Sequence, residues 1–238
     1  MKKQIPNLIT LANLLCGVLA SFFAVKGNLQ LAALLICGGI FFDFFDGLAA
    51  RLLGVASPLG KELDSLADVV TSGVAPGFIL LAILWENPLG HWVACVALLM
   101  PLFAAYRLAK FNLDTRQSHS FLGLPVPANA LIWAGLAPYL TAFYPNFNLT
   151  GTIICIVITL STDILMVSEL PMFSLKFNFK DMSWKSNSIQ YVFILGCIFV
   201  ILLSAPDWSH GLPWGVISIL ILWYIILSII TCKRHNAR

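Results

Sequence analysis

Four aspartates at positions 43, 46, 64 and 68 are the residues of this sequence best suited to chemistry. Asp43 and Asp46 are three residues apart, and Asp64 and Asp68 are four apart, so each pair projects from one face of a helix. Oxygen ligands without nearby His or Cys favour the hard divalent ions Mg²⁺ and Mn²⁺. Four carboxylates suit two such ions, which is the arrangement that promotes in-line displacement at phosphorus. The spacing therefore predicts two divalent cations, Mg²⁺ or Mn²⁺, and phosphoryl transfer.

The helices that carry these aspartates are expected to lie in a membrane. Of the 238 residues, 59% are hydrophobic and 11% are charged, whereas a soluble domain has roughly 25% charged residues. The mean hydropathy of +0.89 leaves too few polar residues to cover a water-facing surface. The composition indicates an integral membrane protein and excludes a soluble enzyme, a disordered chain and a nucleic-acid-binding module.

Eight apolar runs are long enough to cross a bilayer, which takes about 20 residues each. They lie at roughly 6–25, 29–50, 62–85, 91–111, 124–144, 149–168, 189–205 and 213–232. The predicted fold class is therefore all-α, with about eight transmembrane helices. Within it, Gly73-x3-Gly77 with Pro76 is typical of a close helix crossing or of a kink.

The orientation follows from the basic residues. With the N-terminus in the cytoplasm, thirteen of the fourteen Lys and Arg residues fall on cytoplasmic segments, and only Lys26 falls outside. This predicts an N-in, C-in topology. At 1.5 Å per residue, Asp43 and Asp68 both lie about 10 to 12 Å inside the cytoplasmic boundary. Four carboxylates at this depth require a polar cavity, which we expect to open to the cytoplasm.

Small and basic residues around the aspartates fit a phosphate ligand. Gly47 and Ala50 leave space on the first aspartate helix, and Gly60 allows a backbone or base to approach closely. Arg51 and Lys61 are suited to hold a diphosphate. The alternative, in which these two bases only pair with the aspartates, is disfavoured because two bases cannot balance four acids in a low-dielectric environment.

The pattern Asp43-x2-Asp46-Gly47-x2-Ala50-Arg51-x8-Gly60-x3-Asp64-x3-Asp68 resembles the signature of the CDP-alcohol phosphotransferases at all eight fixed positions. The resemblance implies a membrane enzyme that displaces CMP from a CDP-linked lipid with the hydroxyl of a second alcohol. It also implies a homodimer.

The resemblance further assigns roles to single residues. Asp43, Asp46 and Asp64 would ligate one metal ion, and Asp46, Asp64 and Asp68 the other, with Asp68 as the catalytic base. The CDP site would comprise Gly47, Ala50, Arg51, Ser57, Gly60 and Lys61, together with Asn7 and Thr10 of the first span.

Further motifs are similar to the phosphatidylserine synthase branch of that family. They are Asn7-Leu8-Ile9-Thr10-x2-Asn13, Arg107 to Asn112, Phe121 to Ala128, and Leu165 to Ser168. This similarity implies CDP-diacylglycerol and L-serine as substrates in the cytoplasmic (inner) membrane. It also divides the chain into a six-helix core, residues 1–168, and a segment 169–238 with a cytoplasmic loop and two additional helices of the same domain.

A serine pocket needs a fixed cation for the carboxylate and an acceptor for the ammonium. Arg107 is the best carboxylate anchor, with Asn112 beside it, and Asp163 is suited to the ammonium. An alternative stays open for each charged residue. Arg107 could simply follow the positive-inside rule. Asp163 could snorkel to the interface or form a hydrogen bond with Ser161 or Thr162. The Gly123 to Pro127 stretch is compatible with a part in serine recognition and equally with a rigid turn at the entry to a helix.

Two other functions compete with this prediction. The same reaction class is compatible with glycerol 3-phosphate or inositol phosphate as acceptor, although such acceptors require more cations than Arg107, Lys110 and Arg116 supply. A divalent cation transporter would use the aspartates as a transit site, but it leaves Arg51 and Gly60 without a role.

Overall fold

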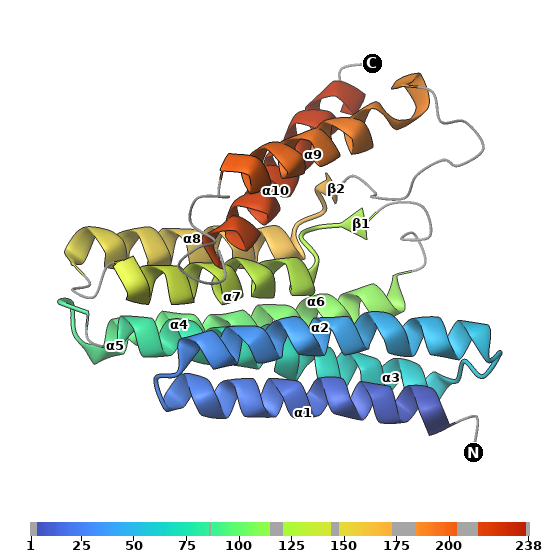
Figure 1. Ribbon diagram of the computed structural model, residues 1–238, viewed down its shortest axis with the longest axis horizontal. Coiled ribbons are helices and arrows are strands. Elements are labelled where there is room, and N and C mark those ends of the chain that lie inside the picture. The colour runs from blue at the N-terminus through green and yellow to red at the C-terminus, as the bar shows by residue number, and fades with distance from the viewer. Residues whose placement is uncertain are drawn as a thin grey trace.

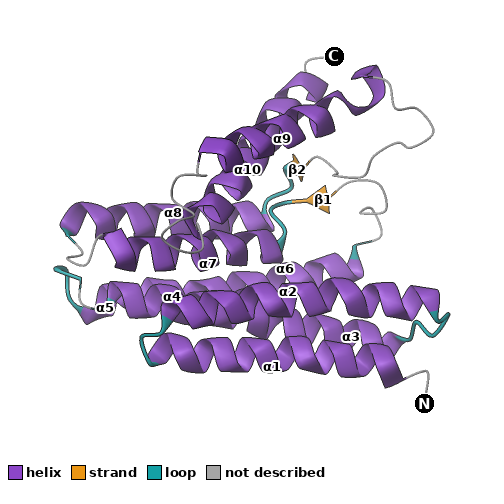
Figure 2. Ribbon diagram, in the orientation of Figure 1, coloured by secondary structure: helices purple, strands orange, loops and turns teal. Residues whose placement is uncertain are grey.

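The computed structural model describes residues 4–85, 87–114, 121–143, 148–172, 184–203 and 214–236, and in these residues it is almost entirely helical (Figure 2). Arg116, which the sequence places in the loop before residue 121, lies outside the described residues. The helical elements are α1 (Ile5–Val25), α2 (Leu29–Leu52), α3 (Pro58–Asp68), the π-helical turn η2 (Val69–Val74), α4 (Ala75–Leu84), α5 (His91–Ala94), the 3-10 turn η3 (Cys95–Leu98), α6 (Leu99–Leu113), α7 (Val126–Phe143), α8 (Leu149–Val167), α9 (Trp184–Leu203) and α10 (Trp214–Asn236).

Six helices of the described chain are long and apolar enough to cross a membrane. They are Ile5–Val25, Leu29–Leu52, Pro58–Leu84, His91–Leu113, Leu149–Val167 and Trp214–Thr231. Each matches one of the eight expected runs, and the remaining two runs correspond to α7 and to α9, whose apolar part is Ile189–Ile201. The protein is thus a multi-pass, mainly helical membrane protein, and the count of eight stays a prediction.

The helices are arranged as a bundle with an oblique pair at one side. Figure 1 shows α1 to α4 and α6 to α8 lying side by side, with α9 and α10 set obliquely beyond α7 and α8. One apolar core joins α1, α2, α4 and α7 through residues such as Ile36, Ile79 and Ala134. A second joins α6, α7, α8 and α10 through residues such as Leu108, Met166 and Ile225.

The all-α expectation needs one small correction at the entry to α7. The strands β1 (Phe121–Leu122) and β2 (Pro171–Met172) pair antiparallel. Directly after β1, Gly123 adopts φ +73°, and its N–H donates to the carbonyl of Leu170 at 2.9 Å. A Cβ at Gly123 would lie 2.5 Å from the carbonyl oxygen of Met166, so glycine is needed for both the dihedral and the space. This stretch forms a rigid turn into α7.

The aspartate-bearing helices begin with well-defined caps. The side chain of Asn28 accepts a hydrogen bond from the N–H of Leu31 at the start of α2. At the start of α3, the Ser57 hydroxyl oxygen accepts from the N–H of Gly60, and Pro58 occupies the first helical position. The π-helical turn η2 follows Asp68 directly, and such bulges occur frequently at functional sites.

The predicted helix crossing at Gly73 is confirmed. A Cβ at this position would lie 2.9 Å from the Cβ of Ala104 and 3.3 Å from the Cα of Pro101. The neighbouring Gly77 would similarly meet the Ala97 carbonyl oxygen at 3.1 Å. The two glycines therefore allow η2 and α4 to pack closely against η3 and α6, which carries Arg107.

We predict that Gly73→Ala destabilises the protein, because the added methyl overpacks this crossing at a cost of about 1 to 3 kcal/mol. The unfolding temperature in detergent should fall. The control is Gly38→Ala, also inside a helix, where an added Cβ meets nothing within 4 Å. That variant should keep or raise the unfolding temperature. Equal stability of the two variants would contradict the close packing.

Candidate active site

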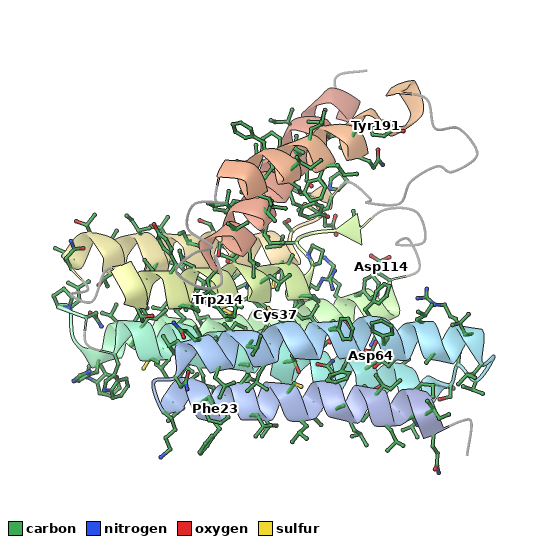
Figure 3. All side chains as sticks on the ribbon, viewed as in Figure 1. Phe23, Cys37, Asp64, Asp114, Tyr191 and Trp214 are labelled. Atoms are coloured by element: carbon green, nitrogen blue, oxygen red, sulfur yellow. The ribbon has the colours of Figure 1, made fainter. Side chains whose placement is uncertain are left out.

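Helices α2 and α3 bring the predicted aspartates together. One carboxylate oxygen each from Asp43, Asp64 and Asp68 lies within 4.8 Å of the others. Asp43 and Asp64 are within hydrogen-bonding range of one another. The labelled Asp64 lies among the helices in the half of the bundle nearer the N-terminus (Figure 3). Asp46 does not belong to the group within 4.8 Å, so its predicted place as a shared metal ligand stays a prediction.

The first helix holds two of these aspartates. The hydroxyl of Thr10 donates to Asp46 Oδ2 at 2.5 Å, and Asn13 Nδ2 donates to Asp68 Oδ1 at 3.2 Å. Both aspartates are buried. Thr10, which the family resemblance places in the CDP site, therefore contacts an aspartate in this structure.

The charge balance of the cluster fits a divalent cation. Asp68 attracts the buried guanidinium of Arg107, which is one positive charge against several carboxylates. Asp64 Oδ1 is buried and has no hydrogen-bond partner among the described residues. An unpartnered carboxylate oxygen in a low-dielectric site is strongly unfavourable unless a cation neutralises it. Oxygen-only donors of this kind suit Mg²⁺ or Mn²⁺.

The residues predicted for the CDP site gather at the ends of α2 and α3. Arg51 is exposed, and its Nε donates to the Gly47 carbonyl at 3.0 Å. A Cβ at Gly60 would lie 3.3 Å from both Asn7 Oδ1 and Ser57 Oγ, so these three residues adjoin. Ala50, one residue before Arg51, is half-buried.

The predicted site residues Lys61 and Asn112 link α3 to α6 instead of pointing to the aspartates. Lys61 Nζ donates to the Asn112 carbonyl at 3.2 Å, and Asn112 Nδ2 donates to Ser65 Oγ at 2.8 Å. Ser65 follows Asp64, so this link fixes the third turn of α3 against the end of α6. The proposed substrate contacts of Lys61 and Asn112 stay predictions.

Arg107 is buried beside the aspartates. Only 8% of its surface is exposed, and its guanidinium carbon lies 5.1 Å from the centre of the Phe111 ring. A residue that only obeys the positive-inside rule would face the aqueous phase. Its burial next to Asp68 instead places a fixed positive charge at the proposed base.

Asp163 of α8 contacts α7. It is fully buried on α8, and its Oδ1 accepts a hydrogen bond from Asn129 Nδ2 of α7 at 3.5 Å. The alternatives of snorkelling or bonding to Ser161 or Thr162 are therefore wrong. Asp163 Oδ2, Asn129 Oδ1 and Trp133 Nε1 have no hydrogen-bond partner in the described part of the chain. Among the described residues, Arg107 interacts with Asp68 of the cluster, whereas Asp163 contacts Asn129.

Comparison with known proteins gives the family. The family model for CDP-alcohol phosphatidyltransferases matches residues 3–162, which is more than half of the chain and includes every aspartate of the cluster. The chain belongs to this family. As a CDP-alcohol phosphatidyltransferase it is an enzyme, and the interpretation as a cation transporter is set aside.

Several curated relatives of this phosphatidyltransferase are named CDP-diacylglycerol–serine O-phosphatidyltransferase. The Bacillus subtilis protein is 36% identical over 166 residues, covering 70% of this chain and 88% of the relative. The Mycobacterium leprae protein is 33% identical, covering 98% of this chain and 75% of the relative. The Helicobacter pylori protein is 32% identical, covering 98% of this chain and 96% of the relative.

One residue of this phosphatidyltransferase site was not predicted. Asn13 belongs to the Asn7 to Asn13 motif without a predicted role, and its contact with Asp68 bridges 55 residues of sequence. The signal that could have found it is its spacing: Asn13 follows Thr10 by three residues, so both face the same side of α1. A polar stripe on an apolar helix indicates a polar neighbour.

Proposed function

We propose that this enzyme transfers the phosphatidyl group of CDP-diacylglycerol to the hydroxyl of L-serine, giving phosphatidylserine and CMP. The observation that carries the choice of acceptor is Arg107, buried beside Asp68. A serine whose hydroxyl meets Asp68 places its carboxylate within a few ångströms of that hydroxyl, where a guanidinium binds it well. The names of the relatives from three bacteria support the same acceptor.

Two divalent cations, Mg²⁺ or Mn²⁺, are proposed to bind at the aspartates. Asp43, Asp46 and Asp64 would hold one ion, and Asp46, Asp64 and Asp68 the other. The carboxylate oxygens of Asp43, Asp64 and Asp68 within 4.8 Å and the unpartnered Asp64 Oδ1 support cation binding here, and the part of Asp46 rests on the family resemblance. When bound, the ions supply positive charge that stabilises the phosphate oxygens and the departing CMP.

In the proposed reaction, Asp68 removes the proton from the serine hydroxyl. A bond forms between that oxygen and the lipid-linked phosphorus while the bond from this phosphorus to the oxygen of CMP breaks. Residues of the CDP site orient the diphosphate: Arg51 supplies charge, and Gly47 and Gly60 leave room for it. Arg107 fixes the serine carboxylate, so the hydroxyl stays aligned with the phosphorus.

The membrane arrangement is part of the proposal. The eight apolar runs support eight spans, and the basic residues support both termini and the site facing the cytoplasm. The cytoplasmic (inner) membrane is proposed from the family resemblance. The family match over 3–162 supports a core at 1–168, with 169–238 as an addition to the same domain. A homodimer is proposed from the family resemblance. Diacyl chains would enter laterally, because removing them from the bilayer costs about 0.8 kcal/mol per CH₂.

Release of CMP by the purified enzyme in detergent tests the function. The assay contains CDP-diacylglycerol and Mg²⁺ or Mn²⁺, with serine, glycerol 3-phosphate or inositol phosphate added in parallel. We expect release with serine only. Release with a phosphorylated alcohol would keep the reaction class and reject serine as acceptor, and no release with any acceptor would reject the proposed function.

We predict that Arg107→Gln raises the KM for serine about 10- to 100-fold, because it removes a charge-assisted hydrogen bond worth about 1.5 to 3 kcal/mol. The KM for CDP-diacylglycerol should stay within about 3-fold, because Arg107 is proposed to bind serine and not this substrate. Lys110→Gln on the same helix is the control, because Lys110 forms only a half-exposed ion pair with Glu169 at 3.4 Å. An unchanged serine KM in Arg107→Gln would reject the anchor.

A further inference from the structure

Asn13 is a fully buried polar residue in contact with the aspartate cluster. Its Nδ2 donates to Asp68 Oδ1 at 3.2 Å, and its backbone carbonyl accepts from the hydroxyl of Thr71 at 2.9 Å. Its own Oδ1 has no hydrogen-bond partner among the described residues. A buried amide whose oxygen accepts no hydrogen bond lowers the free energy of unfolding. The presence of Asn13 therefore calls for an explanation other than stability.

The surroundings hold this amide in place. A Cβ at Gly39 of α2 would lie 2.9 Å from Asn13 Oδ1, and a Cβ at Gly17 of α1 would lie 2.5 Å from Thr71 Oγ1. The absence of these two side chains is what leaves room for Asn13 and Thr71 between α1, α2 and η2. An ionised carboxylate only accepts hydrogen bonds, so the amide must turn its N–H side to Asp68 and its oxygen to α2.

We propose that Asn13 is a positioning residue that acts on the reaction through Asp68, an inference that rests on the proposed function. Its N–H holds Asp68 Oδ1, which fixes the carboxyl group in one rotamer. The other oxygen, Oδ2, is then directed to the acceptor and takes the serine proton. The Thr71 hydroxyl fixes the backbone of Asn13, and Thr71 lies on η2, the turn that directly follows Asp68. Asp68 is therefore fixed both by η2 and by Asn13 of α1.

A double-mutant cycle of Asn13→Leu and Asp68→Asn tests the proposal. Leucine is close to asparagine in size but cannot donate. In the wild-type background, Asn13→Leu should lower kcat about 10- to 100-fold, the usual effect of losing a partner that orients a reacting group. The KM for serine and for CDP-diacylglycerol should stay within about 3-fold. In the Asp68→Asn background, the same substitution should change kcat less than about 2-fold, because the group on which Asn13 acts is gone.

Two results would overturn the proposal: a wild-type kcat in Asn13→Leu, or the same fold-loss of kcat in both backgrounds, which indicates a merely structural residue. Ser218→Ala is the matched control for a lost buried hydrogen bond, since Ser218 Oγ donates to the Ile132 carbonyl at 2.7 Å, between α10 and α7. It should lower the unfolding temperature and keep kcat. If the wild-type enzyme releases no CMP with serine, the proposed function fails. The double-mutant cycle is then measured with the acceptor that is active, and the proposal for Asn13 still requires that Asn13→Leu lowers kcat only when Asp68 is present.

Discussion

The rate of serine-dependent CMP release is expected to fall roughly 1,000-fold or more in Asp64→Ala. The substitution removes a ligand of the proposed cation site and with it several kcal/mol of charge stabilisation in the transition state. Asp64 faces Asp43 and Asp68 within 4.8 Å, and its Oδ1 has no other partner among the described residues. The measurement is CMP release at saturating serine, CDP-diacylglycerol and Mn²⁺.

A second readout separates lost cation binding from misfolding. Addition of Mn²⁺ should raise the unfolding temperature of the wild-type protein, because a ligand that binds only the folded state stabilises it. This rise should disappear in Asp64→Ala. Glu62→Ala is the control, since Glu62 is exposed on the same helix and should keep both activity and the rise. If Asp64→Ala kept its activity and its response to Mn²⁺, the proposed metal site would be wrong.

The second large effect is expected for Asp68→Asn, which should lower kcat about 100- to 10,000-fold, the range for loss of a general base. The substitution keeps the size of the side chain, and its amide oxygen can still accept from Asn13 Nδ2. The fold should therefore be retained, and the KM for serine should change little, because Arg107 still binds the carboxylate. Steady-state kinetics of CMP release with varied serine measures both constants.

The control for Asp68→Asn is an increase in metal concentration. If turnover returned to near the wild-type value at saturating Mn²⁺, Asp68 would act as a ligand whose loss only weakens cation binding. Asp68 would then not be the base. Persistent loss of kcat with an unchanged unfolding temperature would support the base assignment.

Much of this site was accessible from the sequence because its information is local. The spacings within Asp43–Asp46 and Asp64–Asp68 determine which helix faces carry the carboxylates. The short connection through Ser57 keeps α2 and α3 near each other, and α1 packs against both of them. Similar distances of Asp43 and Asp68 along the chain from that connection then place them at similar depths. The apolar composition likewise determines a membrane protein, since backbone groups in lipid must be satisfied within helices.

The tertiary structure decided which residues surround the cluster, because these contacts join segments far apart in the chain. Thr10 reaches Asp46 over 36 residues, and Asn13 reaches Asp68 over 55. The packing of α6 buries Arg107 beside Asp68, whereas the sequence also left open a position at the surface. Asp163 turns to Asn129 on α7 for the same reason: periodicity indicates which face of α8 is buried but not which helix covers it. The choice of neighbour depends on close packing at small residues such as Gly39 and Gly73, which no single helix determines.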